Sequence, residues 1–163
     1  MTVFTGWLES TALSIWIRES ISIFAFPFFL TLHAWGMGFL AGGNAAVDLR
    51  ILGFAPRVPL DAMRKFYPAM WFGFVINTIS GILLLIGYPT KALTNPLFYV
   101  KLGCIAAGMV LMIRLRDRVV RPGDPGIPNA KATAVLSLLM WTTAIVAGRL
   151  LAYTCRYLMY GSP

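Results

Sequence analysis

Four long stretches of apolar residues, separated by short polar segments, dominate this chain. The first stretch runs from Ile21 to Val47 without one formal charge. A helix rises about 1.5 Å per residue and a bilayer core is about 30 Å thick, so about 20 apolar residues cross it. The pattern therefore predicts an all-α polytopic membrane protein with four transmembrane helices, over residues 20–52, 63–86, 96–115 and 132–157.

A shorter amphipathic segment, residues 1–19, precedes the first span. Phe4, Leu8, Ile15 and Trp16 fall within one broad arc of a helix. Tryptophan is enriched where a bilayer meets water, and the segment lacks the basic region of a cleavable signal peptide. The sequence therefore predicts an interfacial N-terminal helix followed by a single four-helix domain.

Composition agrees with a membrane location. Apolar residues make up 58% of the chain and charged residues 12%, and mean hydropathy is +0.74. Soluble domains carry about 25% charged residues. The net charge is +8. In a membrane protein such a charge is explained by basic cytoplasmic loops that contact anionic lipid, so we expect no nucleic-acid partner.

The distribution of Lys and Arg predicts the orientation, because basic residues gather in cytoplasmic connections. Five basic residues belong to the side that holds both termini: Arg18, Lys91, Lys101, Arg149 and Arg156. Nine belong to the connections after spans one and three: Arg50, Arg57, Arg64, Lys65, Arg114, Arg116, Arg118, Arg121 and Lys131. We expect a bacterial inner-membrane protein with both termini in the periplasm.

His33, the only histidine, is the first candidate for chemistry. Counted from Ile21, it lies about 18 Å from the outer boundary, and Lys101 and Arg149 lie about 7 to 10 Å nearer that surface. Ionisable residues at such depths usually mark functional sites. Purely structural roles are the alternatives. His33 would hydrogen-bond a neighbouring helix, and the Lys101 and Arg149 side chains would extend to the outer lipid headgroups.

Two cations without an acidic residue in their own spans favour an anionic or carbonyl ligand. One candidate is haem b, with His33 on the iron and the propionates near Lys101 and Arg149. The opposite axial ligand would be a methionine such as Met70, the His33 of a neighbouring protomer, or absent. A quinone hydrogen-bonded by His33 or Lys101 is the second candidate, a phospholipid headgroup is the third, and no cofactor at all stays open.

Two further features have structural interpretations. Asp48 and Arg50 stand at the cytoplasmic end of span one, and we expect Asp48 to pair with Arg64 or Lys65 and to fix the loop. Gly38 and Gly42 form a GxxxG pair, which predicts close helix packing inside the bundle or, alternatively, a contact between protomers.

Six motifs in the chain resemble those of a family of bacterial four-helix integral inner-membrane proteins of unknown function. They are TLHAWG, DLRILGF, YPAMWFGF, GILLL, NPLFYVKLG and AGRLLAY, and the resemblance covers residues 20–155. It implies four spans and singles out six residues: His33, Asp48, Arg50, Asn95, Lys101 and Arg149. Of these, we expect His33, Lys101, Arg149 and Asn95 to bind the cofactor, with His33 as the metal ligand. Many members carry an acidic residue three before the histidine, where this chain has Leu30. The arrangement of four helices with a single histidine is also loosely similar to that of small cytochrome b-type and copper-resistance membrane proteins.

Three functions follow as hypotheses. The leading one is a membrane subunit of a redox or electron-transfer assembly that binds haem b or quinone around His33, with other membrane subunits or further copies as partners. The second is a non-catalytic structural or assembly subunit. The third is a small-solute or anion channel lined by His33, Asn77 and Lys101.

Overall fold

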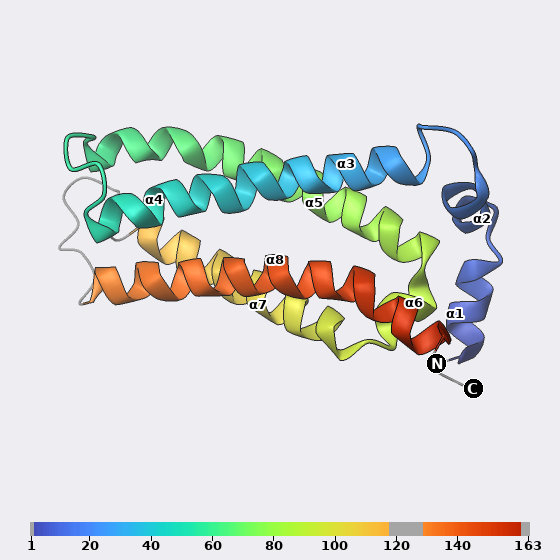
Figure 1. The fold of residues 1–163 in the computed structure, drawn as a ribbon. Coiled ribbons are helices and arrows are strands. Elements are labelled where there is room, and N and C mark those ends of the chain that lie inside the picture. The colour runs from blue at the N-terminus through green and yellow to red at the C-terminus, as the bar shows by residue number, and fades with distance from the viewer. Residues whose placement is uncertain (1, 118–128, 161–163) are drawn as a thin grey trace.

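The computed structural model describes residues 2–117 and 129–160, and the regular elements of these residues are all helical. Long helices run side by side, and short helices gather at one end (Figure 1). In chain order they are α1 (Thr2–Glu9), α2 (Ala12–Glu19), α3 (Phe26–Met37), η1 (Gly38–Gly42), α4 (Gly43–Leu52), η2 (Leu60–Lys65), α5 (Phe66–Gly87), α6 (Pro89–Leu93), α7 (Pro96–Leu115) and α8 (Ala130–Tyr160).

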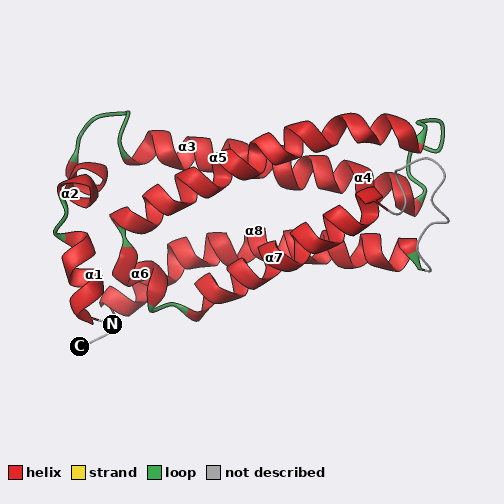
Figure 2. Ribbon diagram, turned by 180° about the vertical axis from the view of Figure 1, so that it is seen from behind, coloured by secondary structure: helices red, strands yellow, loops and turns green. Residues whose placement is uncertain are grey.

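Three helical segments of the described residues are long and apolar enough to cross a membrane: Leu60–Gly87, Pro96–Leu115 and Ala130–Tyr153. In addition, α3, η1 and α4 follow one another without a break and form another column beside α5 (Figure 1). Helices α7 and α8 pack closely along each other, whereas α5 runs obliquely between this pair and α3 (Figure 2).

The first long helix begins at Phe26 rather than at residue 20, which corrects the predicted boundary. The hydroxyl groups of Ser20 and Ser22 accept hydrogen bonds from the backbone N–H groups two residues ahead, at 3.2 Å each. Such local bonds compete with helix formation. Pro27 stands in the first turn of α3, where its fixed φ favours a helix start, so it does not kink the helix interior.

The N-terminal segment forms two helices in place of the single predicted one. The hydroxyl groups of Ser10 and Thr11 donate to the carbonyls of Trp7 and Leu8 at 2.7 Å each and so close α1. Thr11 then caps α2, accepting a bond from the N–H of Ser14. Helix α1 contacts α6, so the short helices gather at one end of the bundle (Figure 2).

The segment η1 is a π-helical turn inside the first column. A π-turn closes i→i+5 hydrogen bonds and therefore holds one residue more than an α-turn. The column changes partners across it, because α3 packs mainly on α5 whereas α4 packs mainly on α8.

Gly36 and Gly73 bring α3 and α5 together. A Cβ atom on Gly36 would lie 2.8 Å from the Gly73 carbonyl oxygen and 2.7 Å from the Asn77 nitrogen. Gly38 and Gly42 are exposed, and a Cβ atom on either would meet nothing within 4 Å. The prediction that this GxxxG pair packs inside the bundle is therefore wrong, because the close approach involves the other face of the helix.

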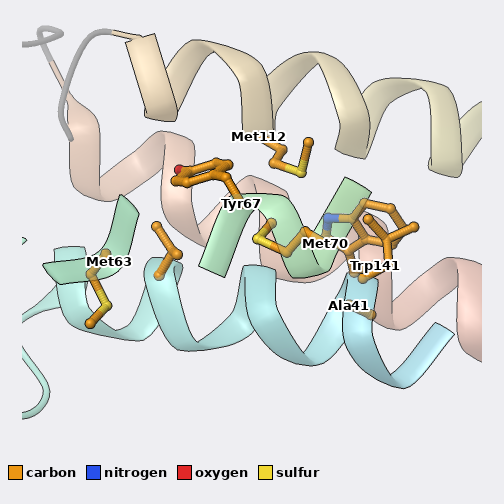
Figure 3. Close-up of a cluster of buried hydrophobic side chains, with 8 residues drawn as sticks. Ala41, Met63, Tyr67, Met70, Met112 and Trp141 are labelled. Atoms are coloured by element: carbon orange, nitrogen blue, oxygen red, sulfur yellow. The ribbon is translucent and has the colours of Figure 1, made fainter. Parts of the chain in front are cut away.

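Large side chains fill the bundle near the end that carries α4. Met70 and Met112 are almost fully buried there, and the Trp141 ring lies against Gly108 (Figure 3). Tyr67 and Met63 extend this cluster toward the loop end of α5. The core of the protein is thus concentrated in this half of the bundle.

Candidate functional site

His33 projects from α3 onto one face of α5. Its Nδ1 atom lies 3.1 Å from the Asn77 carbonyl oxygen and 3.1 Å from the Ser80 hydroxyl oxygen. The side chain of Asn77 donates in return to the His33 carbonyl oxygen at 2.8 Å. A Cβ atom on Gly81 would lie 3.2 Å from His33 Cε1, so the absence of a side chain there makes room for the imidazole.

These bonds determine which way the imidazole is protonated. A carbonyl oxygen can only accept, so the nitrogen facing Asn77 carries the hydrogen, as assigned from the hydrogen-bond network. The other ring nitrogen, Nε2, then presents its lone pair to Lys101, whose Nζ lies 3.4 Å away. The structure thus joins His33 and Lys101 into one polar pair supplied by α3 and α7.

The two side chains meet although the sequence placed them at different depths. Helix α3 begins at Phe26, so His33 lies only about 10 Å from the start of its helix. Lys101 follows Pro96, the first residue of α7, by five residues, and its flexible stem spans the remaining distance. Counted from these two helix starts, His33 and Lys101 differ by about 3 Å along the bundle, instead of the predicted 7 to 10 Å.

The His33–Lys101 pair lies on the wall of a cavity of about 320 Å³ between α3, α5, α6, α7 and α8. The remaining lining is largely apolar. The side chains and glycines around the cavity are Phe26, Leu30, His33, Gly81, Leu84, Leu85, Tyr88, Lys91, Ala92, Phe98, Lys101, Gly148, Leu151 and Ala152. This is the chemistry of a small-ligand site, with an apolar wall and a few convergent polar groups.

Two other predicted binding residues lie outside this lining. Arg149 is exposed, and its neighbour Gly148 faces the cavity instead, with the Lys101 stem packed on it. Asn95 caps α7, as its position before Pro96 predicted, and accepts a hydrogen bond from the N–H of Leu97 at 3.0 Å.

Met70 is too far from the imidazole to ligate a metal opposite His33. It precedes Gly81 by eleven residues on α5, which is about 16 Å along the helix. It is fully buried, and a Cβ atom on Gly43 would lie 2.6 Å from its side chain.

Asp48 belongs to a second polar cluster at the other end of the bundle. The predicted pairing with Arg64 or Lys65 is wrong: the Asn44 amide donates to Asp48, and Arg64 pairs with Asp61 at 3.3 Å. The reason is that this face of α4 turns toward α8 and away from the loop. Arg50 fixes the loop instead, donating to the carbonyls of Pro56 and Val58.

Sequence reasoning missed the small and neutral residues that complete both sites. Ser80 and Gly81 lie three and four positions after Asn77 and share its helix face. Asn44 lies four positions before Asp48, and this spacing could have linked the two. No local signal pairs Asn44 with Ser137, which lies on α8.

Comparison with models of protein families, with curated proteins and with solved structures finds no match. The resemblance carried by the sequence motifs therefore stays a prediction.

Proposed function

We propose that the chain spans a bacterial inner membrane four times, with the column α3–η1–α4 as the fourth span. This column covers residues 26–52, or about 40 Å of helix, which is enough to cross a hydrocarbon core. Apolar side chains such as Phe28, Trp35 and Phe39 cover its exposed face. Exposed Trp7 and Trp16 on α1 and α2 suit the outer interface.

The charges support an orientation with both termini in the periplasm. Loops and helix ends near α4 carry Arg50, Arg57 and Arg64, whereas α1 and the C-terminal part of α8 lie at the opposite end (Figure 1). Cytoplasmic connections are the basic ones. The cavity at His33 then belongs to the periplasmic half of the membrane.

We propose that the protein is a membrane subunit of a redox assembly and binds a quinone in this cavity. The observation that carries the proposal is the His33–Lys101 pair, with 3.4 Å between its nitrogens, on the wall of an otherwise largely apolar space. A quinone carbonyl accepts a hydrogen bond from the Lys101 ammonium, while the ring contacts Leu84 and Phe98. Leu30 and Ala152 are exposed cavity residues, and they give the isoprenoid tail a route to lipid.

The reaction of such a site is the reduction of quinone to quinol, which takes up two electrons and two protons. The chain supplies one proton donor beside the ligand, the Lys101 ammonium, because His33 Nε2 carries no hydrogen and its Nδ1–H is held by the Asn77 carbonyl. The second proton comes from the aqueous phase. The electrons come from a partner subunit that carries a metal redox centre. Exposed Gly38 and Gly42 offer a surface on which a helix of such a partner, or of a second copy, can pack closely.

Quinone fits the cavity better than haem b. An iron ligated by His33 would take Nε2, which faces Lys101, and the ammonium would then stand beside the metal. Small-molecule sites range from about 300 to 1,000 Å³, and this cavity lies at the lower end of that range. Met70 is remote from the imidazole.

The test is binding of a decyl-chain ubiquinone to the protein in lipid nanodiscs, followed by titration calorimetry. We expect Lys101→Met to weaken binding about tenfold or more, because a hydrogen bond to a charged group contributes about 1.5 to 3 kcal/mol. The matched control is Arg149→Met, which removes a cation outside the cavity and should bind as the parent protein does.

Equal affinity of the Lys101 and Arg149 variants would contradict the quinone site. A visible spectrum with haem bands that disappear in His33→Ala would replace quinone with haem as the ligand. Unfolding curves of both methionine variants show whether a loss of binding reflects a loss of fold.

A further inference from the structure

The second polar cluster, at the α4 end of the bundle, holds a fully buried carboxyl group. Asp48 and Ser137 are 0% exposed and Asn44 is 1% exposed. The Asn44 amide nitrogen donates both to Asp48 Oδ2 and, at 2.8 Å, to the Ser137 hydroxyl oxygen. One amide thus ties a carboxyl group on α4 to a hydroxyl group on α8.

The two oxygens of this carboxyl group differ in their surroundings. Oδ2 accepts from Asn44, whereas Oδ1 is buried and has no hydrogen-bond partner among the described residues. An ionised carboxylate accepts at both oxygens, whereas a protonated one has a carbonyl oxygen that accepts and an O–H. A charged oxygen buried without a donor is costly, so Oδ1 is the oxygen at which protonation relieves the cost of burial.

No cation of the described residues is paired with this carboxyl group. Among the side chains that the structure describes, in residues 4–117 and 129–153, the observed ion pairs include Arg18–Glu19, Arg64–Asp61 and Arg116–Asp117, and none involves Asp48. Burying an unpaired charge is costly, and a group in that position tends to become neutral.

The elements packed around Asp48 bring no compensating charge against it. Helix α5 contributes Tyr67, whose buried hydroxyl has no partner in the described part of the chain. Arg116 and Asp117, which follow the last residue of α7, are bonded to each other at 2.8 Å. Helix α8 contributes the neutral Ser137. The charged residues of η2, which are Asp61, Arg64 and Lys65, are all exposed, and Asp61 and Arg64 are paired.

We propose that Asp48 is a proton-binding site, with the proton on Oδ1 and with Asn44 and Ser137 as its polar surroundings. The Asn44 amide points its N–H groups into the cluster, which disfavours a metal cation there. Asp48 lies one turn before Leu52, the last residue of α4, so its proton exchanges with the aqueous side that carries the Arg50 loop. This inference does not depend on the quinone site.

Infrared spectroscopy of the protein in lipid nanodiscs tests the proposal, because a protonated carboxyl group has its own carbonyl band. We expect this band in the parent protein at neutral pH, its loss in Asp48→Asn, and its retention in Asp61→Asn, which removes an exposed carboxylate. Raising the pH should remove the band reversibly.

A second variant covers the case in which Asp48→Asn fails to fold. Asn44→Ala removes the donor to Oδ2, so the carbonyl band should move to higher frequency while persisting at neutral pH. The proposal is overturned if the parent protein shows no band that responds to either substitution. It is also overturned if the band appears only after sodium is replaced by a large organic cation, since the site would then hold a metal ion.

Discussion

The two polar sites of this bundle differ in how they are enclosed. At the α6 end, His33 and Lys101 border a cavity, and glycines at 81 and 148 leave space beside them. At the α4 end, Asp48 and Asn44 are sealed between helices, close to the cluster of large side chains that includes Met70. The bundle therefore provides a ligand-sized space at one end and a closed polar contact at the other, depending on the size of the neighbouring side chains.

The largest effect should come from opening the closed end. Met70 is fully buried, and Met70→Ala should lower the free energy of unfolding by about 3 kcal/mol through lost burial and a new cavity. Leu84→Ala removes a side chain that already borders a cavity, so it should cost about 1 kcal/mol. Denaturant unfolding in detergent micelles measures both, and equal losses would show that the two ends do not differ in packing.

An intermediate effect should follow from separating α3 and α5. A methyl group on Gly36 would clash with the backbone of Gly73 and Asn77, so Gly36→Ala should cost about 2 kcal/mol. Gly103 is the matched control, because a Cβ atom there meets nothing within 4 Å and alanine favours a helix. Thermal unfolding compares the two, and a stable Gly36→Ala protein would disprove the close contact.

The smallest effect on stability should come from narrowing the cavity. A Cβ atom on Gly148 would lie 3.6 Å from Lys101 Cε, an ordinary contact, so Gly148→Ala should unfold as the parent protein does. It should weaken decyl-ubiquinone binding a few-fold, because the methyl group restricts the Lys101 stem. Unchanged binding in calorimetry would place the ligand elsewhere.

Helix ends with local signals were predicted well from the sequence. The predicted span 96–115 coincides with α7, because Asn95 and Pro96 specify its start. The start of α3 was misplaced, because apolar residues from Ile21 onward concealed the serine bonds that delay the helix.

The candidate site was predicted in part. Depth and charge singled out His33 and Lys101, which the structure brings together. Arg149 was grouped with them because its depth is similar, but depth carries no information on helix rotation, and Gly148 faces the cavity instead. The partners of Asp48 also depend on rotation, which the π-turn at Gly38–Gly42 alters without any distinctive residue pattern.

The π-turn also determines how the side chains before it and after it are oriented around the column α3–η1–α4. Each residue of an α-helix advances the side-chain direction by about 100°. Because the π-turn absorbs one extra residue, deleting Gly42 would restore a regular helix and leave the later side chains, Asp48 among them, facing about the same way. The angular phase between His33 and Asp48 is therefore set by the π-turn: the same residues wound as a regular α-helix would turn Asp48 by about 100°, away from Ser137, and lose the inner cluster while keeping the cavity.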